Sequence, residues 1–394
     1  MEKPLYVTKP YLPELAEFIP YLQKIWERRV LTNGGPFHEE LEKVLAEYLG
    51  VKYVSLFANG TLALMTALQT LRIKGDVITT PFSFAATTHS LLWNDIKPVF
   101  CDIEPDTLTL DPNKIVKSIT TNTTAIMPVH VYGNPCKMEQ IQEIAYVHGL
   151  KVIYDAAHSF GVNYKGESIL NYGDLSVLSF HATKVFNTFE GGAIICHDLQ
   201  TKQRIDFLKN FGYLDEVTIV TPGMNAKMNE VQAAMGLLQL KTIDERIENL
   251  RTISLRYKER LREIAGISTF PEMDHVKHNY SYFPILIHEE LFGANRDLVY
   301  EHLKHKNIFA RRYFYPLISD FPIYSSLPSS NSNNLPVSTM ASQKILCLPN
   351  FATITPDEID YVCDSLIEIQ KNSKAFVNIE KQIHNINSGE VQLN

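Results

Sequence analysis

Ser179-Phe180-His181-Ala182-Thr183-Lys184 ends one apolar run and leads, after a short connection, into a second one. The runs Leu175–Phe180 and Ala193–Cys196 have the length and composition of buried strands. Lys184 lies between them among Ala, Val and Phe, and burial there would depress its pKa because desolvation disfavours the ammonium form. A neutral amine can attack an aldehyde and form a Schiff base. Taken alone, however, the stretch fits a lysine on a surface loop better.

Predicted strands and helices alternate from Tyr53 to Cys196, and the strands are apolar and rich in β-branched residues. The strand candidates are residues 53–57, 77–80, 98–103, 125–131, 151–154, 175–180 and 193–196, and helical segments occupy 61–71, 86–92, 112–119 and 138–148. This alternation predicts a mainly parallel sheet with helices on its faces. Right-handed crossovers would bring the carboxyl ends of the strands, and therefore a ligand site, to one edge of that sheet.

The composition argues against several classes of protein. The 394 residues are 45% hydrophobic, and the net charge of −7 without a basic tract argues against nucleic acid as a partner. The five cysteines are widely spaced, which is typical of buried thiols in a reducing compartment. Residues 1–10 lack the apolar segment of a signal peptide, and no apolar run of about 18 residues predicts a membrane span. We therefore expect a cytoplasmic protein, and the scattered histidines predict no metal site.

Two stretches that follow early strands carry candidate binding groups. Ala58-Asn59-Gly60-Thr61 ends a strand and starts a helix, where the glycine, the free N–H groups and the Thr61 hydroxyl can hold a phosphate. The alternative is an ordinary Asn-Gly turn in which Thr61 caps the helix. Phe84, after the next strand, can stack on a planar ring or can be a core aromatic residue.

A carboxylate and a hydroxyl stand at the ends of two later strands. Asp155 follows the run Lys151–Tyr154, where a buried carboxylate is costly unless a cation pairs with it. A pyridinium N–H would serve as that cation, and the alternative is that Asp155 caps the following turn. Ser179, at the end of the strand before Lys184, can donate to a phosphate. Phosphate donors, a stacking ring, a pyridinium partner and an imine-forming amine are together what pyridoxal 5′-phosphate requires, so we expect this cofactor.

The chain divides into four expected segments. They are an N-terminal helical segment (1–50), a large pyridoxal-phosphate-binding domain (51–250), a smaller α+β domain (251–372) and a polar tail (373–394). Residues 229–264 have the pattern of one long helix or two continuous ones, which would lead from one domain into the next. In the smaller domain we expect strands at 280–287 and 309–315 and a mobile loop at 325–334.

The motifs resemble those of the DegT/DnrJ/EryC1/StrS family of sugar-nucleotide aminotransferases over residues 5–370. The matching stretches are Leu31-Thr32-Asn33-Gly34-Gly35-Pro36, Asn59-Gly60-Thr61, Asp155-Ala156-Ala157-His158, Ser179–Lys184, Glu190-Gly191-Gly192 and Asn225-Ala226-Lys227-Met228-Asn229-Glu230. The resemblance implies the α/β fold of type I pyridoxal-phosphate-dependent aminotransferases, with a mainly parallel central sheet and a smaller C-terminal α+β domain. It also implies a homodimer whose two subunits share their active sites.

The resemblance gives a role to each matching residue. Lys184 and Asp155 would be the catalytic residues, the first forming the Schiff base with the cofactor and the second pairing with its pyridine nitrogen. The implied cofactor-binding residues are Gly60, Thr61, Phe84, Asp155, His158, Ser179 and Lys184, with Asn225 supplied by the neighbouring subunit.

Candidates for substrate binding are more scattered. They are Thr32, Asn33, Lys227, His278, Tyr280, Arg311 and Tyr313. The family usually has Arg at the position of Lys227, so a two-pronged contact is not implied there. Alternatively, Arg311 and Arg312 can both be exposed to solvent without a ligand, and residues 278–280 can be a turn at the start of a strand.

His181 and Glu190 are the local features that resemble the branch of the family that aminates C-4 of the sugar rather than C-3. Within that branch the resemblance implies dTDP-4-keto-6-deoxyglucose as the acceptor and L-glutamate as the donor, in a ping-pong transamination. The product would be dTDP-4-amino-4,6-dideoxyglucose, which is used for bacterial O-antigens.

Several alternatives stay open at this point. They are amination at C-3, an axial amine at C-4 that gives the galacto product, a UDP or GDP sugar, and a non-catalytic sensor on the same fold. A nicotinamide enzyme is disfavoured because no GxGxxG follows the first strand. The presence of both Lys184 and Asp155 argues against the sensor.

Overall fold

A seven-stranded sheet forms the centre of the larger part of the molecule in the computed structural model, which describes residues 3–387. The strand order is β2-β10-β9-β6-β5-β3-β4, and only β10 runs antiparallel to its neighbours. The strands are β2 (Tyr53–Phe57), β3 (Asp76–Thr79), β4 (Lys97–Phe100), β5 (Thr123–Met127), β6 (Lys151–Asp155), β9 (Leu175–Ser179) and β10 (Gly192–Cys196). The predicted α/β class with a mainly parallel central sheet is therefore confirmed.

Helices cover both faces of this sheet because its strands are apolar on both sides. Alternation along the strands sends Val177 and Ile194 into one buried cluster and Leu178 and Ile195 into the other. The covering helices are α2 (Pro36–Leu49), α3 (Gly60–Thr70), α4 (Ala85–Leu92), α5 (Pro112–Ser118), α6 (Met138–His148), α7 (Leu199–Leu208) and α8 (Glu230–Leu240). The helix α1 (Leu15–Arg28) packs against α8.

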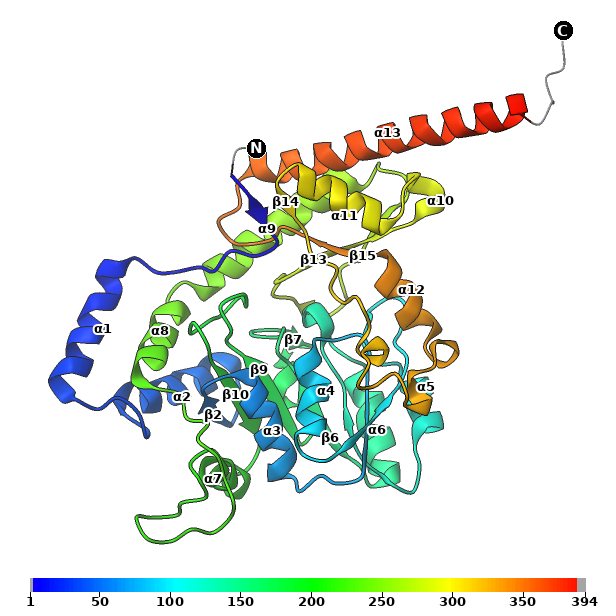
Figure 1. Cartoon of the computed structure of the whole chain (residues 1–394). Helices are drawn as coiled ribbons and strands as arrows, with labels where there is room; N and C mark the ends of the chain where they lie inside the picture. The colour runs from blue at the N-terminus through cyan, green and yellow to red at the C-terminus, as the bar shows by residue number, and fades with distance from the viewer. Residues whose placement is uncertain (1–2, 388–394) are drawn as a thin grey trace.

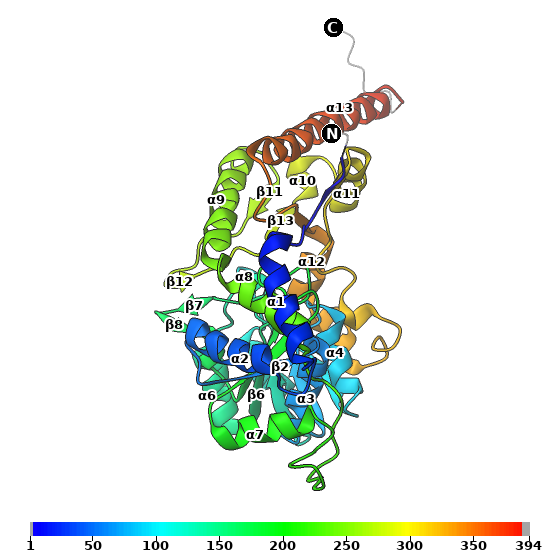
Figure 2. The same ribbon diagram turned by 90° about the vertical axis from the view of Figure 1, so that its left-hand side faces the viewer.

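The smaller part of the molecule is built on a three-stranded antiparallel sheet of order β11-β13-β15. Its strands are β11 (Ile267–Thr269), β13 (Phe283–Ile287) and β15 (Ile345–Leu348), and its helices are α9 (Ile243–Leu261), α10 (Glu289–Phe292), α11 (Arg296–His305), α12 (Pro336–Lys344) and α13 (Pro356–Asn387). Figure 1 shows this part at one end of the molecule and the seven-stranded sheet at the other, with α9 leading between them. Figure 2 shows the same division from the side.

Short strands tie distant segments together. The strand β1 (Leu5–Tyr6) pairs in parallel with β14 (Ile308–Phe309), so the beginning of the chain lies with the smaller part. A second small sheet has the order β12-β7-β8, with β7 (Asn163–Tyr164), β8 (Glu167–Ser168) and β12 (Val276–Lys277). This small sheet joins the connection between β6 and β9, which contains β7 and β8, to the segment that precedes β13.

Several elements differ from the sequence-based expectations in extent. The 229–264 segment forms two helices, α8 and α9, with a break at residues 241–242. The expected strand at 309–315 is reduced to β14, and residues 325–334 contain two short 3₁₀ turns, at Pro328–Ser330 and Ser332–Asn334. The expected tail at 373–394 begins inside α13, which continues to Asn387, and residues 388–394 lie outside the described residues.

Two expectations drawn from composition can be compared with the structure. All five cysteines are buried free thiols, as their spacing predicted. Within residues 3–387, none of the helices combines the length and the apolar character that a membrane crossing needs.

Candidate active site

A cavity of about 580 Å³ opens where β6 and β9 end and α3 begins. Its wall includes most of the residues that the sequence predicted for a cofactor site. These are Gly60, Thr61, Phe84, Asp155, His158, Ser179 and Lys184, together with Tyr313. The parallel strands bring them together because their carboxyl ends meet at one edge of the sheet.

The amino end of α3 forms one end of the cavity. Asn59 caps this helix by accepting a hydrogen bond from the Leu62 N–H at 2.9 Å, so Asn59 and not Thr61 is the cap. The first N–H groups of a helix have no partner inside the helix and attract anions. A Cβ added to Gly192 would lie 2.8 Å from the backbone nitrogen of Gly60, so a side chain there would push on this helix start. Close packing at Gly192 therefore holds the start of α3 in place, and N–H groups at such a helix start can hold a phosphate group.

Asp155 is the last residue of β6 and is only 4% exposed. Its Oδ2 accepts a hydrogen bond from the Thr87 hydroxyl at 2.7 Å, and its Oδ1 accepts one from the Ala157 N–H at 3.1 Å. Burial raises the pKa of this carboxyl group, while the two hydrogen bonds and the nearby Lys184 oppose that rise. No residue in the described part of the chain forms an ion pair with it within 4.0 Å. The carboxylate is thus placed to stabilise a cation within the cavity.

Lys184 lies in the connection between β9 and β10, as the sequence predicted. Burial lowers the pKa of its amine to about 8, and the nearby Asp155 and Tyr313 oppose that change. Its Nζ donates a hydrogen bond of 3.1 Å to the Tyr282 hydroxyl. A substantial fraction of this amine is therefore uncharged in mildly alkaline solution, which is the form that attacks a carbonyl carbon.

His158 is a neutral hydrogen-bond donor in this site. Its Nδ1 accepts the backbone N–H of Tyr132 at 3.0 Å, which assigns the ring proton to Nε2. Burial lowers the pKa of the imidazole well below its usual value, and the charge of Lys184 acts in the same direction. The predicted contact of His158 with the cofactor stays a prediction.

The rim of the cavity carries the two residues that suggested chemistry at C-4. Nε2 of His181 lies 3.6 Å from a carboxylate oxygen of Glu190, and both side chains are exposed. Phe84, also at the cavity, is 61% exposed, so it is not a core aromatic residue. An exposed ring in this position is free to stack on a bound planar group.

Several residues that the sequence predicted for the site do not line this cavity in the described part of the chain. Thr32, Asn33, Asn225, Lys227 and Arg311 are absent from its wall. Nζ of Lys227 donates a hydrogen bond of 2.5 Å to the side-chain oxygen of Asn210. The backbone of Arg311 pairs with that of Cys347.

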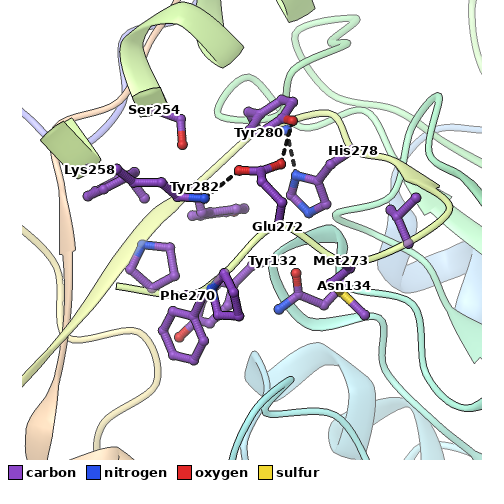
Figure 3. Close-up of a pocket in the computed structure, with 14 residues that line it drawn as sticks. Tyr132, Asn134, Ser254, Lys258, Phe270, Glu272, Met273, His278, Tyr280 and Tyr282 are labelled. Carbon is purple, nitrogen blue, oxygen red and sulfur yellow. Dashed lines mark hydrogen bonds and ion pairs between the residues drawn. The ribbon is translucent and has the colours of Figure 1, made fainter. Parts of the chain in front are cut away.

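His278 and Tyr280 line a second and smaller cavity of about 60 Å³, which is shown in Figure 3. There the Tyr280 hydroxyl donates to Glu272 at 2.8 Å, and Glu272 also forms an ion pair with Lys258. Tyr282 contributes to the walls of both cavities. A sugar-binding role for His278 and Tyr280 in the larger cavity stays a prediction, because in the single chain they line the smaller one.

Two residues with clear contacts in the site were missed. Thr87 holds Asp155, and it belongs to a stretch after β3 in which only the aromatic residue was considered. Tyr282 holds Lys184 from a distance of 98 residues in the sequence, and no local pattern marks it.

Comparison with known proteins gives a family for this arrangement. Residues 14–367 match the DegT/DnrJ/EryC1/StrS aminotransferase family. The chain is 52% identical over 374 residues to the dTDP-4-amino-4,6-dideoxy-D-glucose transaminase of Shigella dysenteriae, which covers 94% of this chain and 100% of that protein. The enzyme of the same name from Escherichia coli is 52% identical over 359 residues, or 90% of this chain and 96% of that protein.

A solved structure agrees with the fold. The structure of DesI, determined in the presence of its TDP-sugar product, matches with a TM-score of 0.91 at 34% identity and covers 96% of each chain. The predicted family resemblance and the predicted aminotransferase class are thereby confirmed. The chain belongs to the DegT/DnrJ/EryC1/StrS aminotransferase family.

Proposed function

We propose that the protein transfers the amino group of L-glutamate to C-4 of dTDP-4-keto-6-deoxyglucose. The products would be dTDP-4-amino-4,6-dideoxy-D-glucose and 2-oxoglutarate. The observation that carries the proposal is the meeting of Lys184 and Asp155 at one cavity, with the start of α3 at its end. The choice of sugar is supported by the names of the two relatives that are 52% identical to this chain.

The residues of the cavity fit pyridoxal 5′-phosphate. The start of α3 and Ser179 would hold the phosphate, the exposed ring of Phe84 would cover a face of the pyridine ring, and Asp155 would oppose the charge on the ring nitrogen. When bound, this cofactor supplies an aldehyde that condenses with amines and a ring that withdraws electrons from the attached carbon. The buried carboxylate of Asp155, which lacks an ion-pair partner among the described residues, is the feature that a pyridinium N–H would complement.

Lys184 would act first as a nucleophile and then as a base. Burial keeps the Lys184 amine partly uncharged, and this amine would hold the cofactor until the amino group of L-glutamate takes its place. The freed Nζ would take the proton from the α-carbon of glutamate and return it one position along, which is general base and acid catalysis by one group. In the second half-reaction the same amine would move a proton in the opposite direction, and it would then take the place of the new C-4 amine so that the aminated sugar is released.

We further infer that the active enzyme is a homodimer. Asn225 and Lys227 match a family motif, yet they lie outside the wall of the cavity in their own chain. Near them the segment 213–220 carries exposed apolar side chains, including Val217 at 87% exposure. We propose that this region contacts a second subunit, where Asn225 would reach the phosphate.

We also propose that the enzyme acts in the cytoplasm and that its aminated sugar is used for a bacterial O-antigen.

Turnover of dTDP-4-keto-6-deoxyglucose with L-glutamate and added pyridoxal 5′-phosphate tests the proposal, with the product analysed by NMR. An equatorial amine at C-4 leaves H-4 axial, so H-4 should show large couplings to both H-3 and H-5. The corresponding UDP and GDP sugars serve as competing acceptors. Nitrogen on C-3, small couplings at H-4, or preference for another nucleotide would each reject the proposed product, and Lys184→Ala should give no multiple turnover.

A further inference from the structure

The hydroxyl of Tyr282 is the hydrogen-bond partner of the Lys184 amine. Nζ of Lys184 lies 3.1 Å from Oη of Tyr282 and 5.6 Å from the centre of its ring. Within the described residues this is the one hydrogen bond that the lysine side chain makes. Tyr282 immediately precedes β13 of the smaller part of the molecule. It therefore contacts, from that part, a lysine in the connection between β9 and β10 of the larger sheet.

The ring of Tyr282 is held firmly from several sides. Its centre lies 4.7 Å from that of His158, 5.7 Å from that of Tyr132 and 6.2 Å from that of Tyr313. The side chain is 9% exposed. Packing of this kind fixes the direction of the C–O bond of Tyr282, so the position of its hydroxyl does not depend on the contact with Lys184.

A phenolic hydroxyl suits an amine that gains and loses a proton. It can accept a hydrogen bond from an ammonium group and can donate one to a neutral amine. Burial raises the pKa of the Tyr282 hydroxyl, so it keeps its proton over the range in which Lys184 changes charge. One side chain can therefore follow the lysine through both of its states by rotating only a hydrogen atom.

We propose that Tyr282 is a positioning residue that holds the free Lys184 amine beside the reacting carbon in both its protonated and its neutral form. The proposal rests on the proposed role of Lys184 as the proton carrier. It adds to that role a partner outside the motifs that identify the family. It also distinguishes Tyr282 from the neighbouring Tyr280, whose hydroxyl binds Glu272 in the second cavity.

The test is the variant Tyr282→Phe, which keeps the ring and removes the hydroxyl. Each half-reaction is followed by stopped-flow absorbance of the bound cofactor, first with glutamate and then with the keto sugar. Loss of a hydrogen bond to a charged group predicts that both rates fall by about 10- to 100-fold. The dissociation constants of both substrates, from the concentration dependence of the same traces, should change less than about twofold, because the hydroxyl acts on the lysine and not on the substrates.

A second readout does not depend on turnover. In the protein without cofactor, the pH dependence of Lys184 modification by an amine-reactive reagent, located by peptide mapping, reports the pKa of this amine. Removal of the acceptor Oη favours the uncharged form, so the variant should have a lower Lys184 pKa than the wild type. A purely structural role of the ring would leave this value unchanged in Tyr282→Phe.

Tyr257→Phe is the matched control. Tyr257 is also buried, and its hydroxyl donates to the carbonyl oxygen of Pro349 at 2.9 Å, away from the cavity wall. This variant should retain wild-type half-reaction rates. If Tyr282→Phe does not fold, 3-fluorotyrosine at position 282 keeps the ring and the hydroxyl but weakens the acceptor, and it should lower the Lys184 pKa by a smaller amount.

The outcomes separate this proposal from the proposed function. Wild-type half-reaction rates and an unchanged Lys184 pKa in Tyr282→Phe would overturn the role of Tyr282 while leaving Lys184 as the base. Failure of the wild type to aminate the dTDP sugar would reject the proposed substrate, and the glutamate half-reaction would still test Tyr282.

Discussion

The hydroxyl of Thr87 donates a hydrogen bond of 2.7 Å to Oδ2 of Asp155, and both side chains are buried. Thr87 belongs to α4 and Asp155 ends β6, so the contact fixes a carboxylate against a helix from another part of the sheet's covering layer. The Ser83 hydroxyl in turn lies 2.8 Å from that of Thr87. This chain of hydroxyl groups orients the one buried carboxylate of the cavity wall without neutralising it.

Asp155→Asn should remove most of the activity while the protein stays folded. The amide keeps the shape and can still accept hydrogen bonds, but it cannot oppose a positive charge on a bound ring. Removal of one partner of a buried ion pair costs about 3 to 5 kcal/mol, so kcat should fall by about 10²- to 10⁴-fold. Thr87→Val, which removes only a donor to the carboxylate, should lower kcat by about tenfold. Equal activity of wild type and Asp155→Asn would contradict the assigned role.

Gly192→Ala should weaken cofactor binding. The added Cβ would lie 2.8 Å from the carbonyl carbon of Asn59 and from the nitrogen of Gly60, so the start of α3 must move. Overpacking of this kind costs about 1 to 3 kcal/mol, so the affinity for the cofactor should fall by about 5- to 150-fold. Fluorescence titration of the protein without cofactor measures this. Gly166→Ala, at φ +85° and with no atom within 4 Å of the added Cβ, strains the backbone away from the cavity wall and should bind the cofactor normally.

The charge of Lys184 should make the cofactor-free protein sensitive to pH. Its folded-state pKa is lowered from 10.5 to about 8, so between these values the unfolded chain binds more protons and stability rises with pH. Lys184→Met removes this term. At pH 7 the variant should be more stable than the wild type by about 3 kcal/mol, and the difference should shrink as the pH rises from 8 towards 10.5. Urea unfolding across this range measures the difference, and a gap that does not change with pH would be inconsistent with a buried amine.

Glu230 explains one glycine of the Gly34-Gly35-Pro36 turn. Its carboxylate accepts hydrogen bonds from the N–H groups of Phe37 at 3.0 Å and His38 at 2.8 Å, at the start of α2. A Cβ on Gly35 would lie 2.5 Å from Cδ of Glu230. Gly35→Ala and Glu230→Ala should each lower the free energy of unfolding by about 1 to 3 kcal/mol.

The double variant Gly35→Ala/Glu230→Ala tests this coupling. The three atoms nearest to the added Cβ are Cδ, Oε1 and Cγ of Glu230, and Glu230→Ala removes all three. The double variant should therefore lose less stability than the sum of the two single losses. Strict additivity in urea unfolding would show that the glycine serves another purpose.

The sequence was sufficient for the parts of the site that lie at strand ends. Gly60, Asp155, Ser179 and Lys184 could be placed together from residue patterns, because alternation predicts a parallel sheet and parallel strands share one edge. Each of these residues was ambiguous alone. Their order along the sheet made the cofactor site the better interpretation, and the cavity lined by all four agrees with it.

The contribution of the smaller part could not be predicted in the same way. Tyr280 was expected to begin a strand, and alternation would then have placed Tyr280 and Tyr282 on one face. In the structure Tyr280 has φ +50° and β13 begins only at Phe283. The left-handed residue turns the backbone, so Tyr280 lines the second cavity and Tyr282 contacts Lys184. Few sequence patterns announce a positive φ at a tyrosine.

The proposed reaction depends on Lys184 as the amine that carries the cofactor. Borohydride reduction of the protein with pyridoxal 5′-phosphate, followed by peptide mapping, tests it most directly because reduction makes the carbon–nitrogen bond permanent. We expect one pyridoxyl group per chain, on Lys184, and its loss when the protein is first treated with excess L-glutamate. A stable label on another lysine, or no label in protein that aminates the sugar, would show that Lys184 does not carry the cofactor.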